Sequence, residues 1–210
     1  MKVIIFGASG GIGKWAVKHA LEKGYEVTAY VRNPDKLTSK HEKLTVVKGE
    51  ISDYDTMRDA VQGQDAVIWC VGIPMKKYEK MESLPGHENL IRAMDECRVK
   101  RLIDWSTTST PSEKDKKSFW TVVPPIMVGI TMPTAKKELI GISDLLKKSD
   151  LDWTIVRFLA PNDKPATGKV VAGYGGTKMK IAIPREDIGV FMVEQVESAK
   201  YLRDMPLIGT

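Results

Sequence analysis

Three glycines at three-residue spacing follow the first apolar segment, and this feature constrains the fold more than any other. Residues 2–6 (KVIIF) form an apolar run, typical of a central strand covered on both faces, and Gly7, Gly10 and Gly13 come next. Residues 12–23 then carry apolar side chains at helical spacing. Between a strand and a helix, such glycines permit a tight turn, backbone approach to a pyrophosphate and close helix–strand packing. The pattern predicts a dinucleotide-binding unit.

The rest of the chain alternates strand and helix patterns. This alternation predicts an α/β fold: a Rossmann-type, doubly wound parallel sheet in three αβα layers, with strand order 3-2-1-4-5-6 plus a short extra strand. With 210 residues, we expect one domain, 1–210. The strands are expected at residues 2–6, 26–31, 44–48, 65–72, 101–106, 152–158, about 178–183 and 206–209. The helices are expected at residues 12–23, 53–61, 87–98, 134–148 and 185–197.

Two segments break this rhythm, at about 107–133 and 159–177. Both are rich in proline, glycine or small polar residues, and both follow late strands. We therefore expect them to be irregular and to lie at the carboxyl edge of the sheet, where α/β folds bind ligands. A substrate pocket between them would include Phe119, Trp120 and Tyr174. We expect Arg157 and Arg185 to hold these loops through salt bridges.

Composition excludes several classes of function. The net charge of +5 is not gathered into a basic stripe with aromatic residues, so we expect no direct nucleic-acid partner. No apolar run approaches the roughly 20 residues that span a bilayer, and the N-terminus does not read as a signal peptide. We expect a cytoplasmic protein without a membrane partner, monomeric or homodimeric. The two cysteines, expected to be reduced and buried, and the three histidines show no ligand or triad spacing, so no metal site is expected.

The end of the second expected strand indicates which dinucleotide binds. A free ribose 2′-hydroxyl usually meets Asp or Glu there, but this chain reads AYVRNP and has Arg32 instead. A guanidinium forms bidentate, charge-assisted hydrogen bonds to a phosphate. We therefore predict NADP(H) in preference to NAD(H), with Ser9 as a hydroxyl donor to the same 2′-phosphate.

The chain resembles the atypical short-chain dehydrogenase/reductase superfamily over nearly its whole length. It is most similar to the NAD(P)H-binding group that includes NmrA-like proteins and the biliverdin-IXβ/flavin reductases. The N-terminal motifs are specific for the superfamily, and the later ones are less so. The motifs that carry the resemblance are GASGGIG, VRNPDKL, GEISD, DAVIWCVG, SDLDWTIVR and PREDIG, with VVPP and DKPATG for the biliverdin-IXβ/flavin reductase branch.

The resemblance implies a set of cofactor contacts. Glu50 and the Ile51 backbone would contact the adenine, and Gly72 would lie beneath the nicotinamide-side ribose. At Glu50 the family has aspartate, one methylene shorter, so this contact departs from the pattern. The positions that match the family's phosphate loop are Gly7, Ser9, Gly10, Gly11, Ile12 and Gly13, and Arg32 matches its 2′-phosphate arginine.

Typical superfamily members use a Tyr-x-x-x-Lys pair as acid/base, and the corresponding segment here, TMPTAKKELIGISDLLKK, has no tyrosine. Alcohol oxidation and epimerisation need a positioned acid/base, whereas hydride transfer to an electrophilic acceptor needs mainly orientation. Ser106 and Thr107, where the family keeps its active-site serine, are the candidate catalytic hydroxyls. We predict an NADPH-dependent reductase of a flat conjugated small-molecule acceptor such as a flavin, quinone or tetrapyrrole.

Two other functions stay open at this point. The first is a non-catalytic NADP(H)-binding redox sensor of the NmrA-like kind, which would act through a protein partner. The second, which we disfavour because the C-terminal region is short, is a nucleotide-sugar epimerase or dehydratase.

Overall fold

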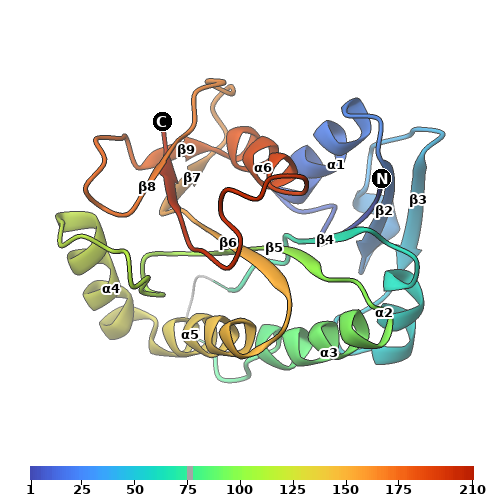
Figure 1. The fold of residues 1–210 in the computed structure, drawn as a ribbon, viewed down its shortest axis with the longest axis horizontal. Coiled ribbons are helices and arrows are strands. Elements are labelled where there is room, and N and C mark those ends of the chain that lie inside the picture. The colour runs from blue at the N-terminus through green and yellow to red at the C-terminus, as the bar shows by residue number, and fades with distance from the viewer. Residues whose placement is uncertain (75–77) are drawn as a thin grey trace.

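A mostly parallel sheet forms the centre of the molecule (Figure 1), a computed structural model that describes residues 1–74 and 78–210. Within these residues the strand order is β3-β2-β1-β4-β5-β6-β10-β8, which contains the predicted order 3-2-1-4-5-6. Among the strand pairs of the described residues, only β10–β8 is antiparallel. The strands of this sheet are β1 (Lys2–Phe6), β2 (Glu26–Val31), β3 (Leu44–Lys48), β4 (Ala66–Trp69), β5 (Arg101–Ser106), β6 (Asp152–Arg157), β8 (Val171–Gly173) and β10 (Leu207–Gly209).

Helices cover both faces of the sheet and complete three layers (Figure 1). Alternate residues of β1 point to opposite faces, as strand geometry requires: Val3 and Ile5 belong to one apolar core, and Ile4 and Phe6 to the other. The first core lies under α1 (Gly13–Glu22) and α6 (Arg185–Glu194). The second lies under α2 (Tyr54–Val61), α3 (Ser83–Glu96) and α5 (Pro133–Lys148).

Segment 107–133, expected to be irregular, contains a 13-residue helix, α4 (Phe119–Thr131). The expectation was wrong because Ser118 and Thr121 form a reciprocal capping box that starts the helix, although Pro124 and Pro125 lie inside it. Segment 159–177 contains β8 and β7 (Ala160–Asn162), and β7 pairs with β9 (Ala182–Pro184) in a small separate sheet. The only other helix within the described residues is the short 3₁₀ turn η1 (Pro34–Lys36).

One buried guanidinium holds three late segments together. Arg157, at the end of β6, pairs with Asp115 at 2.6 Å and donates to the backbone oxygens of Thr110 and Met205. Arg185 forms a second ion pair, 2.8 Å from Asp163. Both arginines therefore hold late loops through salt bridges, as predicted. The N–H of Lys116 donates to the Tyr174 carbonyl at 2.7 Å, so the two segments that break the rhythm do lie against each other.

Candidate cofactor and hydride-transfer site

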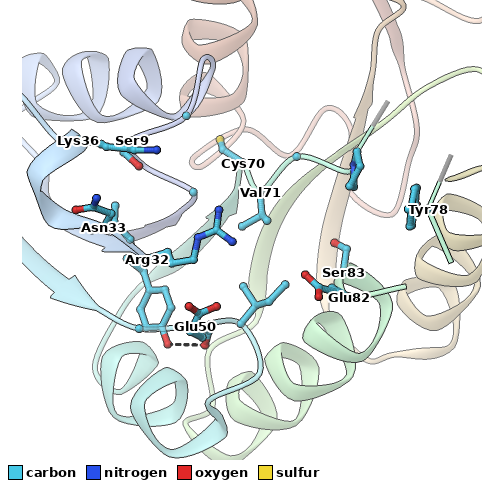
Figure 2. Close-up of a pocket in the computed structure, with 18 of the residues that line it drawn as sticks. Ser9, Arg32, Asn33, Lys36, Glu50, Cys70, Val71, Tyr78, Glu82 and Ser83 are labelled. Carbon is cyan, nitrogen blue, oxygen red and sulfur yellow. Dashed lines mark hydrogen bonds between the residues drawn. The ribbon is translucent and has the colours of Figure 1, made fainter. Parts of the chain in front are cut away.

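A cavity of about 740 Å³ lies at the carboxyl ends of β1, β2 and β4 (Figure 2). This volume falls in the usual range for sites that bind small molecules and cofactors. Its wall comes from the turn after β1, the end of β2, the turn after β3, the loop after β4, the start of α3 and one position of α5. Seven of the ten predicted cofactor residues line it: Gly7, Ser9, Gly10, Arg32, Glu50, Ile51 and Gly72.

The glycine turn is built so that side chains cannot enter it. Gly7 has a φ of +71°, and a Cβ there would lie 2.7 Å from the Cys70 backbone. A Cβ on Gly13 would lie 2.2 Å from the Gly7 carbonyl oxygen, so the first turn of α1 packs directly on the end of β1. These are the tight turn and the close helix–strand packing that the spacing predicts.

The N-terminus of α1 has no side-chain cap and no acidic residue in its first turn. Its free N–H groups and positive dipole end favour an anion at this point. The predicted residues Gly11, Ile12 and Gly13 form this helix start and do not belong to the cavity wall. A Cβ on Gly11 would lie 2.9 Å from the Arg185 side chain, so this side chain of α6 lies against the turn, although Gly11 itself is exposed. The turn and the helix end together fit a pyrophosphate.

Two cations lie at one end of the cavity. Arg32 and Lys36 are exposed and line the wall together with Asn33, whose side chain accepts the Asp35 N–H at 3.0 Å (Figure 2). Within residues 1–74 and 78–210, no carboxylate lies within 4.0 Å of the Arg32 guanidinium. This end of the cavity therefore fits an anionic group such as a phosphate.

The wall beside these cations depends on Tyr30. The Tyr30 hydroxyl donates to the Glu50 carbonyl at 3.0 Å, and a Cβ on Gly49 would lie 2.1 Å from that hydroxyl. Burial, with smaller contributions from Asp53 and Glu50, raises the pKa of Tyr30 to about 12. Gly49 is therefore required by the tyrosine ring, which fixes the turn that presents Glu50 and Ile51 to the cavity.

The opposite end of the cavity is organised by Glu138 of α5, which is 1% exposed. Its carboxylate accepts the backbone N–H groups of Ser83 and Leu84 at 2.6 and 2.9 Å, and so caps α3 from another helix. It also accepts the Tyr78 hydroxyl at 2.5 Å. Burial, and then the Glu138 carboxylate, raise the pKa of Tyr78 above the ordinary tyrosine range. Tyr78, Ser83 and Glu138 all line the cavity.

Helix α3 begins at Ser83, four residues before its expected start, because Glu138 satisfies the first free N–H groups. This earlier start places His87 inside the protein. Nδ1 of His87 lies 2.7 Å from the Ser83 carbonyl oxygen, which can only accept, so Nδ1 carries a proton.

His87 also faces a carboxylate. Its Nε2 lies 3.2 Å from Oδ2 of Asp104, although the angles are not those of a hydrogen bond. Trp69 packs on the imidazole with ring centroids 4.3 Å apart. Both side chains are only 2% exposed, so His87 and Asp104 form one buried pair. It forms a buried polar layer behind Ser83.

The predicted catalytic hydroxyls are not on this wall. Ser106 is 2% exposed, and its Oγ lies 2.6 Å from Oγ1 of Thr110. Thr107 accepts the Ser109 N–H at 3.1 Å. Their catalytic role stays a prediction.

The predicted substrate-pocket residues also lie elsewhere. Phe119 and Trp120 are exposed at the start of α4, and the Tyr174 hydroxyl donates to Asp204. No residue of 107–133 or 159–177 lines the cavity in Figure 2, and an acceptor pocket between these segments stays a prediction.

Lys36, Tyr78, Ser83 and Glu138 are among the wall residues that were not predicted. Lys36 lies within the VRNPDKL motif, so the motif itself was an available signal. Nothing in the local sequence indicates that Tyr78 and Glu138, 60 positions apart, are bonded. Cys70, expected to be buried, is half-buried and lines the cavity; both cysteines are free. Within the described part of the chain, no group of three or more His, Cys, Asp or Glu side chains forms a metal site.

Part of the sequence is similar to curated plant reductases. Cinnamoyl-CoA reductase 1 of Petunia hybrida is 36% identical over 111 residues, which are 48% of this chain and 33% of the plant enzyme. This chain therefore spans only about a third of the length of the first curated relatives that it matches.

Solved structures with low sequence identity share the fold. The anaerobillin reductase ChuY from Escherichia coli O157:H7 superposes with a TM-score of 0.78 at 19% identity, over 100% of this chain and 97% of that one. A short-chain dehydrogenase/reductase from Veillonella parvula in complex with NADP gives 0.77 at 18% identity, over 100% and 94%. The model of the NAD(P)H-binding family matches residues 7–199, which is most of the chain. The chain belongs to the NAD(P)H-binding family and has a Rossmann-type fold.

Proposed function

We propose that the protein is an NADPH-dependent reductase that passes hydride to a flat conjugated acceptor of the flavin, quinone or tetrapyrrole type. One observation carries this proposal: a single cavity joins a side-chain-free glycine turn to the Arg32–Lys36 cation pair. The turn and the uncapped end of α1 would hold the pyrophosphate, and the two cations the 2′-phosphate. The preference for NADP(H) over NAD(H) rests on this pair.

The far end of the cavity offers a fixed hydroxyl group, that of Tyr78. Bound NADPH supplies a hydride, and its addition leaves a negative charge on the acceptor. We propose that water gives this anion a proton, and that the oxygen of the Tyr78 hydroxyl, whose own proton is held by Glu138, positions that water. Tyr78 is preferred to Ser106 and Thr107 because it alone of the three lies on the cavity wall. Burial and the bond to Glu138 keep the phenol protonated and fix its orientation on the cavity wall, so its oxygen is left to accept a hydrogen bond from water.

A screen of acceptors tests the activity. Purified protein is mixed with NADPH and with one flavin, quinone or linear tetrapyrrole at a time, and absorbance at about 340 nm (the reduced-nicotinamide band) is followed. We expect oxidation with at least one acceptor, faster with NADPH than with NADH. Tight NADPH binding without oxidation by any of the three classes would contradict the reductase.

The second candidate is a non-catalytic NADP(H) sensor, favoured by the absence of tyrosine from α5. It predicts that NADP⁺ and NADPH bind with different affinity and alter binding of a protein partner. Turnover in the acceptor screen at rates of about 1 s⁻¹ or more would favour the enzyme.

A further inference from the structure

Helix α4 is apolar on every side and yet none of its residues is buried. Its sequence, FWTVVPPIMVGIT, has only Thr121 and Thr131 as polar side chains. The exposed fractions are 60% for Phe119, 55% for Ile126 and 76% for Ile130. A helix that is hydrophobic all round is normally found in a protein core or in lipid. In this chain it packs against α5 at one end of the molecule (Figure 1).

The sequence of α4 is also a poor helix former in water. Pro124 and Pro125 remove two backbone donors from its interior, and Gly129 adds backbone freedom. The capping box at Ser118 stabilises only the first turn. Most helical stability in proteins comes from packing of an apolar face, and α4 buries no such face within the described residues. The stability of α4 therefore indicates that something outside this chain covers its apolar surface.

The distribution of charge indicates what covers the apolar surface of α4. Residues 107–137, which contain α4, have five lysines against Glu113 and Asp115; residues 159–181 have four lysines against Asp163. These two segments together carry +6, whereas the whole chain carries +5, so the rest of the chain is close to neutral. The segments meet where Lys116 bonds to Tyr174. Three of these lysines lie next to the apolar helix: Lys116 and Lys117 directly precede it, and Nζ of Lys136 donates to the Pro125 carbonyl at 3.0 Å.

We propose that α4 lies flat in the headgroup region of an anionic lipid bilayer and holds the protein on the membrane surface. Apolar and aromatic side chains with nearby lysines are the features of helices that bind this interface. Phe119 and Trp120 pack edge-to-face at 4.8 Å, at the start of the helix, where aromatic rings favour the boundary between headgroups and acyl chains. Lys116 and Lys117, both exposed, precede them and contribute positive charge toward anionic headgroups.

The same observations disfavour a second copy of the chain as the cover, because pairing through α4 would bring two basic regions together. No helix among the described residues is long and apolar enough to cross a membrane, so α4 does not span the bilayer. From the sequence we expect no membrane partner, since no segment has spanning length. A helix that lies in the surface needs no such length, and the proposal revises that expectation.

Vesicle flotation tests the proposal on the full-length protein. Vesicles of pure phosphatidylcholine are compared with vesicles that contain phosphatidylglycerol, at low salt and at high salt. We expect binding to the anionic vesicles, little binding to the neutral ones, and loss of binding at high salt because screening shortens the range of the attraction. Absence of binding to anionic vesicles at low salt would overturn the proposal.

Pairs of substitutions identify which residues contact the lipid. Phe119→Ser with Ile130→Ser should weaken binding to anionic vesicles at least about tenfold, because two anchors no longer bury apolar area. Lys116→Glu with Lys117→Glu should weaken it by a similar factor and reduce its salt dependence. The matched control, Val46→Ser with Leu202→Ser, removes two exposed apolar side chains outside α4 and should bind like the wild type.

Two further measurements distinguish membrane binding by α4 from misfolding and from self-association. Retained affinity for NADPH shows that each variant is folded. Sedimentation of the wild type without lipid reports self-association: a dimer that Phe119→Ser with Ile130→Ser dissociates would assign α4 to a second copy and overturn the proposal. Equal vesicle binding by wild type and this variant would also overturn it.

Discussion

The backbone N–H of Ser83 donates to Oε1 of Glu138 at 2.6 Å, and this bond joins the first turn of α3 to the middle of α5. The same buried carboxylate accepts the Leu84 N–H and the Tyr78 hydroxyl. One side chain therefore caps a helix, links two helices and positions the phenol at the far end of the cavity. The Tyr78 hydroxyl and the N–H groups of Ser83 and Leu84 thus depend on one acceptor, the Glu138 carboxylate.

Glu138→Ala should lower the free energy of unfolding by about 2–4 kcal/mol, because two helix N–H groups and one hydroxyl lose their acceptor. Urea denaturation monitored by circular dichroism measures the change. Lys137→Ala, one position earlier and exposed, is the control and should change stability by less than about 0.5 kcal/mol. Equal stability of the two variants would show that water replaces the carboxylate.

Tyr78→Phe should reduce kcat about fivefold with an acceptor that must be protonated, because the water that supplies the proton loses a hydrogen-bond partner that contributes about 1 kcal/mol. The KM for NADPH should stay unchanged. Tyr174→Phe removes a hydroxyl that bonds to Asp204 away from the cavity, and it should leave kcat unchanged. If Tyr78→Phe is as active as the wild type, Tyr78 does not position the water that supplies the proton.

Arg32→Ala should weaken NADPH binding about 10- to 100-fold, since a charge-assisted contact to a phosphate contributes about 1.5–3 kcal/mol. NADH, which lacks the 2′-phosphate, should bind wild type and variant alike. Calorimetric titration of both cofactors into both proteins gives the four affinities. A parallel loss for NADH would mean that Arg32 shapes the cavity and does not choose the cofactor.

Gly13→Ala should abolish cofactor binding or prevent folding, because the new Cβ would lie 2.2 Å from the Gly7 carbonyl oxygen. Gly72→Ala is the contrasting change: a Cβ there meets no described atom within 4 Å, and its backbone needs no left-handed conformation. We expect Gly72→Ala to keep the wild-type melting temperature. Normal NADPH affinity of Gly13→Ala would contradict the close packing of α1 on β1.

Stability should fall at alkaline pH. The pKa of Tyr30 is raised from 10.0 to about 12 by burial, so the unfolded chain loses this proton before the folded one does. The stabilisation is complete below pH 10 and is lost as the pH rises toward 12. Melting temperatures measured from about pH 8 to about pH 11.5 should decline from about pH 10, and less steeply for Tyr30→Phe. An identical decline would show that other tyrosines dominate.

The sequence predicted those parts of the fold that depend on local pattern. The spacing of Gly7, Gly10 and Gly13 reflects steric limits on the backbone between residues a few positions apart. The continuous apolar runs of the core strands reflect burial on both faces of the sheet. Helix α4 was missed because its prolines suggested a loop, while its start depends on the Ser118 capping box. The Tyr78–Glu138 and His87–Asp104 pairs join residues 60 and 17 positions apart, and only the folded chain brings them together.

The place of β10 between β6 and β8 has a consequence for the order of assembly on the ribosome. Strand β8 is synthesised more than thirty residues before β10, yet among residues 1–74 and 78–210 it pairs with no other strand of the large sheet. The emerging polypeptide can therefore dock β1 to β6 early, but the 171–173 segment stays unpaired until residues 207–209 emerge. Stalled translation before that point should leave this edge open to proteases and to chaperones.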